Sequence, residues 1–148
     1  MAKVVFLGDQ SVGKTSIIKA NSQNFSATQK PTSVLDHSSC TITTDLGSIE
    51  LNIWDTAGQE VYQALAPNYI RDSNAAVIVF AKDDHLSFES LNNWYEIVID
   101  ILGANNNIFI VGNKVDLSDL KVTYEEAFEY AQKKNLQYFE VSAKTGAN

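Results

Sequence analysis

Four short apolar runs recur along the chain: KVVFL at residues 3–7, AAVIVFA at 75–81, IFIV at 108–111 and YFEVS at 138–142. They are rich in β-branched and aromatic residues, and their hydrophobicity is nearly continuous. This pattern is typical of strands that are covered on both faces. We therefore predict four buried strands that run parallel to one another.

Helical and alternating patterns lie between these runs. SFESLNNWYEIVIDIL predicts one helix over 87–102, which Gly103 would end, and TYEEAFEYAQKKN predicts another that begins with a Thr123–Glu126 capping box. A hairpin is expected over 40–54, where CTITT and IELNIW flank a turn at DLGS. Strands that alternate with helices predict an α/β fold, a six-stranded and mostly parallel sheet with helices on both faces.

Composition narrows the possible functions. A length of 148 residues suggests one domain, 1–148, and a net charge of −7 argues against a nucleic-acid partner bound through its phosphates. No apolar run approaches the roughly 20 residues that span a bilayer. The single cysteine, Cys40, fits a reducing cytosol, and His37 and His85 lack the spacing of metal ligands.

Five of the seven glycines follow predicted strands. They fall at or just beyond the carboxyl ends of these strands: Gly8, Gly13, Gly58, Gly112 and Gly146. In an open α/β sheet this edge is where ligands bind. We therefore expect five glycine turns to converge on one ligand.

The stretch GDQSVGKT at 8–15 lies between a predicted strand and a predicted helix that starts near Lys14. Its glycines allow backbone N–H groups to face an anion, Lys14 can reach the β- and γ-phosphates, and Thr15 can bind Mg²⁺. The pattern indicates a nucleoside triphosphate, and a chance match in a loop is the alternative. The predicted phosphate-binding residues are Gly8, Asp9, Gln10, Ser11, Val12, Gly13, Lys14, Thr15, Ser16 and Gly58.

A second candidate segment is DTAGQE at 55–60, directly after an alternating strand. Asp55 can hold Mg²⁺, the N–H of Gly58 can contact a γ-phosphate, and Gln59 can orient an attacking water. The alternative is an ordinary turn, since Asp and Gly favour turns.

Two further segments suggest a guanine site. In GNKVD at 112–116, the Asp116 carboxylate can accept hydrogen bonds from two guanine N–H groups that adenine lacks. Asn113 can contact the base edge or join loops, and the stem of Lys114 can cover the ring. In SAK at 142–144, the N–H of Ala143 can contact the guanine oxygen, with Ser142 and Lys144 nearby.

These four segments, in this order, resemble the Ras superfamily of small GTPases over essentially the whole chain. IWDTAGQE at 53–60, YIRDS at 69–73 and SF at 87–88 are similar to the Rab branch, and GDQSVGKTS with YIRDS to its Golgi-associated subgroup. LAP at 65–67 is also similar to early-endosomal members. The resemblance implies a P-loop fold, binding of GTP or GDP with Mg²⁺, and a GTP-hydrolysing switch in vesicle trafficking. It also implies an exchange factor, a GTPase-activating protein and effectors, on the cytosolic face of Golgi or endosomal membranes.

The resemblance also assigns roles to single residues. Thr32 matches a threonine that binds Mg²⁺ and senses the γ-phosphate, so Gln59, Lys14 and Thr32 are the expected catalytic residues. Phe25 matches an aromatic that packs on guanine, although a core position is an equal alternative. Gln10 replaces a glycine of many relatives, and we expect slow intrinsic hydrolysis that an activating protein accelerates.

The chain departs from the family in its first switch, expected at 24–37. Gln29 stands where many relatives have tyrosine, and His37 replaces a phenylalanine of an aromatic effector triad. Trp54 and Tyr69 match the other two members, so an atypical effector surface is expected. The departures leave open a nucleotide-holding interaction module with impaired switching, whereas a metabolic P-loop kinase would not be expected to carry NKVD.

The last departure is the ending SAKTGAN. Relatives continue into a final helix and a tail with prenylated cysteines, so we expect a truncated chain that reaches membranes only through a tail absent here. An uncovered sheet face would make folding depend on bound nucleotide or on a second copy of the chain.

Overall fold

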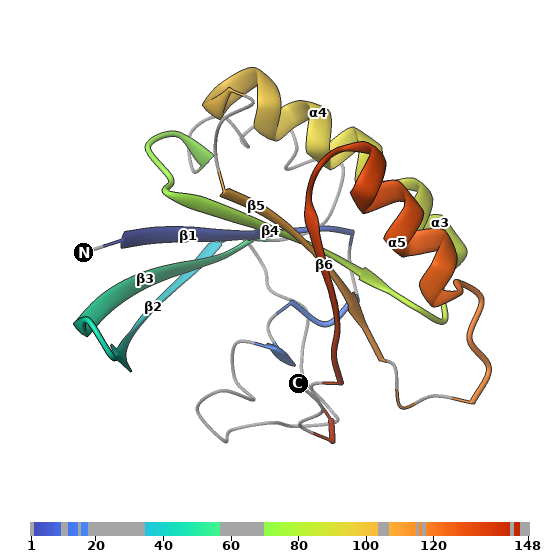
Figure 1. Cartoon of the computed structure of the whole chain (residues 1–148), viewed down its shortest axis with the longest axis horizontal. Coiled ribbons are helices and arrows are strands. Elements are labelled where there is room, and N and C mark those ends of the chain that lie inside the picture. Colours follow the sequence, from blue (N-terminus) through green and yellow to red (C-terminus); the bar gives the residue numbers. More distant parts are fainter. Residues whose placement is uncertain are drawn as a thin grey trace.

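The computed structural model of the chain describes residues 2–9, 12–14, 16–17, 35–56, 70–103, 107–114, 116, 118–142 and 144–145. Within them lies a six-stranded sheet in the order β2-β3-β1-β4-β5-β6 (Figure 1). Its strands are β1 (Ala2–Leu7), β2 (Leu35–Thr44), β3 (Gly47–Thr56), β4 (Ala75–Ala81), β5 (Asn107–Asn113) and β6 (Gln137–Glu140). The expected six-stranded sheet is therefore confirmed.

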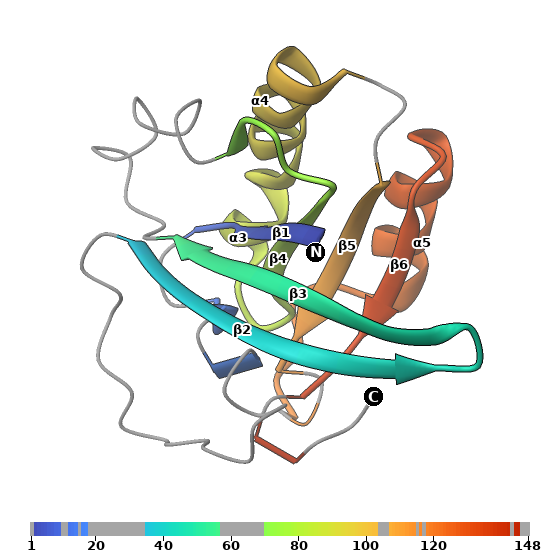
Figure 2. The same ribbon diagram turned by 90° about the vertical axis from the view of Figure 1, so that its left-hand side faces the viewer.

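Strand direction follows the apolar patterns. The four apolar runs form neighbouring parallel strands, and β3 also pairs parallel with β1. The expected burial of the last run is wrong, because β6 lies at the edge of the sheet and its residues are alternately exposed and half-buried. Only β2 is antiparallel, and it forms with β3 the long hairpin at the front of Figure 2. This hairpin extends beyond the predicted 40–54, because Leu35 pairs with Thr56 and Thr44 with Gly47. Residues 35–37, expected in the first switch, therefore belong to β2.

The helices of the described residues are α3 (His85–Glu89), α4 (Leu91–Leu102) and α5 (Tyr124–Lys133). The single helix predicted over 87–102 is wrong: a helix begins earlier, where Asp84 caps the N–H of Leu86, and it is interrupted at Ser90. The carbonyl of Leu86 accepts from both the N–H of Ser90 at 3.0 Å and its hydroxyl at 3.1 Å. In the described part of the chain, none of the helices has the length and apolar character needed to cross a bilayer.

The predicted helix ends are confirmed. Gly103 follows α4 with a positive φ of 83°, and the Thr123 side chain accepts a hydrogen bond from the N–H of Glu126 at 3.1 Å. The carboxylate of Glu126 lies 3.4 Å from His85 on α3, so this part of the capping box also connects two helices.

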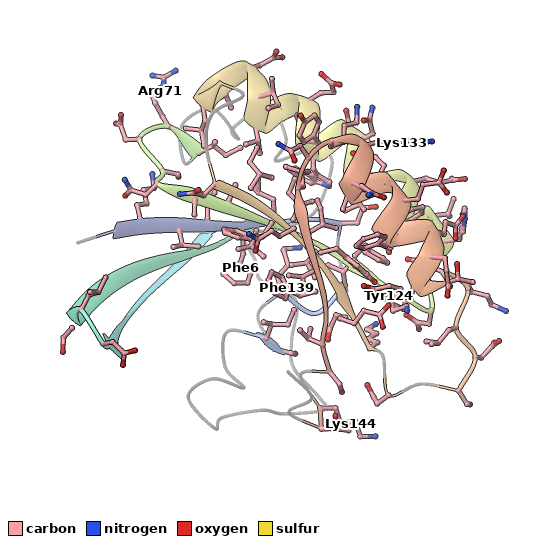
Figure 3. All side chains as sticks on the ribbon, viewed as in Figure 1. Phe6, Arg71, Tyr124, Lys133, Phe139 and Lys144 are labelled. Carbon is pink, nitrogen blue, oxygen red and sulfur yellow. The ribbon has the colours of Figure 1, made fainter. Side chains whose placement is uncertain are left out.

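The core forms two layers on opposite faces of the sheet. In Figure 1, α3, α4 and α5 lie together on one face, over a large cluster that includes Phe80, Trp94 and Val98. Ile17, from the predicted helix after β1, packs against the smaller cluster on the other face. Phe139, labelled in Figure 3, lies on β6. Its ring contacts that of Phe109 on β5, and the residue is 47% exposed.

The strand order places one loop at a special position. After β1 the chain forms β2 and β3 on one side of that strand, and it then crosses to the other side to form β4, β5 and β6. Such a reversal opens a crevice at the carboxyl ends of the strands, where open α/β sheets bind ligands. The segment that begins at Gly8 starts at this crevice.

Candidate functional site

Two glycines shape the loop after β1. Gly8 has a φ of +143° and Gly13 a φ of +98°, conformations that side chains rarely adopt. A Cβ at Gly8 would overlap the carbonyl oxygen of Val79 on β4, and one at Gly13 would overlap the side-chain amide of Asn113. The glycine spacing therefore serves both the curl of the loop and its close approach to β4 and β5.

Lys14 is enclosed by the same loop. Its side chain is buried, and Nζ donates to the carbonyl oxygens of Gly8 at 2.9 Å and Asp9 at 2.8 Å. Burial of an ammonium group is costly unless acceptors surround it, so these contacts fix the cation within the loop. Phosphate oxygens can replace carbonyl oxygens as acceptors, and a contact of Lys14 with phosphate stays a prediction.

A helical turn begins directly after the loop. The N–H of Ile17 donates to the carbonyl of Gly13 at 2.9 Å, as in the first turn of a helix. The N-terminal end of a helix carries a partial positive charge and so favours anions. Val12 is fully buried, while Ser16 is half-buried.

Asn113 joins the phosphate loop to the end of β5. Its Nδ2 donates to the carbonyl of Val12 at 3.0 Å, and its side chain is buried. Of the two predicted roles for Asn113, the structure supports the joining of loops. This contact fixes the distance between the loop after β1 and the segment that was expected to bind a base.

Asp116 and Ser142 come together from different loops. Ser142 Oγ donates to Asp116 Oδ1 at 2.6 Å and accepts from the N–H of Thr145 at 3.1 Å. Asp116 is exposed, whereas Ser142 is buried beneath it. The hydroxyl therefore orients a carboxylate that remains accessible to a ligand.

Two lysines flank this carboxylate in the sequence. Lys114 is half-buried with a positive φ of 65°, and its Nζ lies 4.0 Å from Asp83 after β4. Lys144 is exposed and points outward at the rim of the sheet in Figure 3. Lys114 thus has a fixed backbone position beside the base site, and Lys144 belongs to the segment that carries Ser142.

The predicted metal site is described only in part. Asp55 lies in β3 and pairs with Phe6 of β1. Phe6 is two residues before Gly8, where the phosphate loop begins, so the backbone of Asp55 lies near the start of that loop. A carboxylate at that position suits Mg²⁺ beside bound phosphates. Several predicted site residues lie outside the described residues: Gln10, Ser11, Thr15, Phe25, Thr32, Gly58, Gln59, Tyr69 and Ala143.

The expected effector surface is also described only in its backbone. The β2–β3 register pairs His37 directly with Trp54. The two positions are therefore neighbours across the β2–β3 pair, and their role in an effector surface stays a prediction. Their side chains lie outside the described part of the chain.

A buried ion pair that the sequence did not predict joins the end of β4 to β6. Lys82, which follows β4, is paired with Glu140 of β6, and Lys82 is 2% exposed. Tyr138 donates its hydroxyl to the same carboxylate at 2.8 Å. Burial, followed by the hydrogen bond to Glu140 and its charge, raises the pKa of Tyr138, so the phenol remains a donor. The sequence gives one indication of this ion pair, which is that Lys82 directly follows the buried apolar run at 75–81.

Gly112 requires a correction. It was expected in a glycine turn, yet it lies inside β5. A Cβ there would come within 2.7 Å of the Tyr138 hydroxyl and 2.9 Å of the Phe80 ring. Glycine is needed at this position because the side chains of Tyr138, Phe80 and Lys82 occupy the space that a Cβ would take. Gly58 and Gly146 lie outside the described residues, so five converging turns are not established.

The fold and the site define a class of protein. A glycine loop with a buried lysine follows the central strand β1, and a carboxylate oriented by a serine lies in the loops after β5 and β6. This is the arrangement of an α/β P-loop protein that binds a nucleotide. The family model described as Ras family matches residues 3–148, and the chain belongs to the Ras family.

Family membership establishes the general activity. Ras-family proteins are small GTPase switches that bind guanine nucleotides together with Mg²⁺. They generally interact with exchange factors, GTPase-activating proteins and effectors. The described loops fit a nucleotide through Lys14 and Asp116, which lie on loops that Asn113 joins.

Proposed function

We propose that this chain is a GTP-hydrolysing switch of the Rab type that acts in vesicle trafficking. The observation that carries the proposal is a link between two parts of the site, the phosphate loop that holds Lys14 and the loop that holds Asp116. Lys14 lies within the phosphate loop, Asp116 is oriented by Ser142, and Asn113 bonds the phosphate loop to the strand before Asp116. A guanine nucleotide has phosphates that the Lys14 loop would bind and a base that Asp116 would bind.

In this proposal the chain's own residues prepare hydrolysis. Lys14 stabilises negative charge on the phosphates, and Gln59 orients the attacking water. Thr15, Thr32 and Asp55 are the candidate Mg²⁺ ligands, and the ion would offset charge between the β- and γ-phosphates. Gln10, in the loop, is expected to keep the intrinsic rate slow.

Switching would depend on two segments. Thr32 and Gly58 would bond to the γ-phosphate, order residues 25–34 and 58–69, and release them after hydrolysis. Effectors would contact the ordered state through His37, Trp54 and Tyr69. We place this activity on the cytosolic face of Golgi or endosomal membranes, supported by the similarity of YIRDS and GDQSVGKTS to Rab segments.

A single-turnover assay tests the proposal. We expect Gln59→Leu to lower the rate of GTP hydrolysis about tenfold or more, because the attacking water loses its orienting partner. The affinity for GTP should change little. Gln63→Leu, four residues further along, is the matched control and should hydrolyse GTP at the unaltered rate.

The same assay separates the alternative function. An unaltered chain that binds GTP tightly but hydrolyses it no faster than Gln59→Leu would be a nucleotide-holding module, as the departures at Gln29 and His37 allow. Hydrolysis that an activating protein accelerates would exclude this alternative.

A second copy over the face that carries Phe139 would appear as a dimer in light scattering.

A further inference from the structure

One hydrogen bond connects helix α4 to the phosphate loop. The indole Nε1 of Trp94 donates to Oδ1 of Asp9 at 3.0 Å. Trp94 is 1% exposed and packs in the core cluster between α4 and the sheet, with Leu91 and Val98 of the same helix also buried. Because packing fixes the ring, the direction of its N–H is fixed as well.

Asp9 has two acceptors that face different partners. Its backbone carbonyl accepts from Lys14 Nζ at 2.8 Å, whereas its side chain accepts from Trp94. The backbone oxygen therefore faces the cation that is expected to contact phosphate, and the carboxylate faces α4. The residue is partly buried, so the carboxylate needs a donor nearby.

A carboxylate is an unfavourable neighbour for phosphates. Like charges repel strongly where water is partly excluded, and a loop that cradles phosphates would lose affinity if this carboxylate turned inward. The fixed donor on α4 offers the carboxylate a better position. The sequence position of Asp9, between Gly8 and Gln10 within the loop, gives its orientation a direct effect on nucleotide binding.

We propose that Trp94 is a positioning residue that keeps the Asp9 carboxylate on the α4 side of the phosphate loop and so slows nucleotide release. The inference rests on the proposed nucleotide-binding function. Trp94 acts through Asp9, and does not itself contact the nucleotide. The two partners can be altered separately, because Trp94→Phe removes the indole N–H and Asp9→Asn removes the charge of the carboxylate.

The test measures dissociation of a fluorescent GDP analogue from the whole chain. We expect Trp94→Phe to release it about tenfold faster, since a hydrogen bond to a charged group is lost. Asp9→Asn serves as the reference for the double variant, because its amide oxygen still accepts from Trp94 but carries no charge. Adding Trp94→Phe to Asp9→Asn should change the release rate by no more than about threefold, because the group that loses its donor is then neutral.

Controls separate positioning from packing. Val98→Ala removes core packing on the same helix without touching the loop, and it should not change the release rate. In ¹⁵N spectra, the Trp94 indole signal, assigned by its absence in Trp94→Phe, should shift in Asp9→Asn. The inference would be overturned if Trp94→Phe and the unaltered chain released the analogue at the same rate. It would also be overturned if Trp94→Phe accelerated release as much in Asp9→Asn as in the unaltered chain. Neither result would affect the proposed function. No GDP binding by the unaltered chain would overturn the proposed function, and with it the inference.

Discussion

Asp116→Asn lowers the affinity for GDP by about a thousandfold and creates affinity for xanthosine diphosphate. The carboxylate accepts two hydrogen bonds from guanine in the proposed site, and loss of both charged bonds accounts for this factor. Asparagine presents one donor in place of an acceptor, and xanthine has a carbonyl where guanine has an amine. Ser142 can still donate to the asparagine oxygen, so the loop should keep its shape. Calorimetric titration with both diphosphates measures the change.

Asp119→Asn is the matched control. Asp119 is exposed, lies three residues further along the same segment, and pairs with Lys121 at 3.2 Å. Its replacement should leave both affinities unchanged. Undiminished GDP binding by Asp116→Asn would mean that Asp116 does not select the base.

Lys82→Met lowers the free energy of unfolding by about 3 kcal/mol. The substitution keeps most of the side-chain volume but leaves Glu140 as a largely buried charge without its partner. Backbone groups of Lys82 also bond to Asn113, Lys121 and Val122, so the cost arises where the base-site loops are anchored. Chemical denaturation of the nucleotide-bound chain, at one fixed GDP concentration, measures the change.

Two further variants separate the effect of burial from that of charge. Lys133→Met removes an exposed pair with Glu129 on α5 and should change stability by no more than about 0.5 kcal/mol. Adding Glu140→Gln to Lys82→Met should restore part of the lost stability, because the uncompensated charge is removed. If Lys82→Met is no less stable than Lys133→Met, the buried pair does not stabilise the fold.

The sheet could be predicted because its signals are local. Nearly continuous apolar runs such as residues 75–81 match β4, and the alternating segments match β2 and β3. Motif order predicted that Asp116 and Ser142 lie in the same site, since loops at the carboxyl ends of neighbouring strands meet at one edge. It did not predict the hydrogen bond between them. The Thr123 cap was predicted because its two partners are three residues apart.

The contacts that the sequence did not predict join distant partners. Lys82 and Glu140 are 58 residues apart, and Trp94 and Asp9 are 85 apart, so no local pattern connects them. These contacts are the ones that anchor the loops of the site.

Competitive titration of the unaltered chain with GDP and ADP in the presence of Mg²⁺ tests the central claim most directly. The claim is that the loop around Lys14 binds phosphates while Asp116 selects the base. We expect GDP to bind about a thousandfold more tightly than ADP, because adenine lacks the two donors that Asp116 accepts. Equal affinity for the two diphosphates, or retention of neither, would contradict the account.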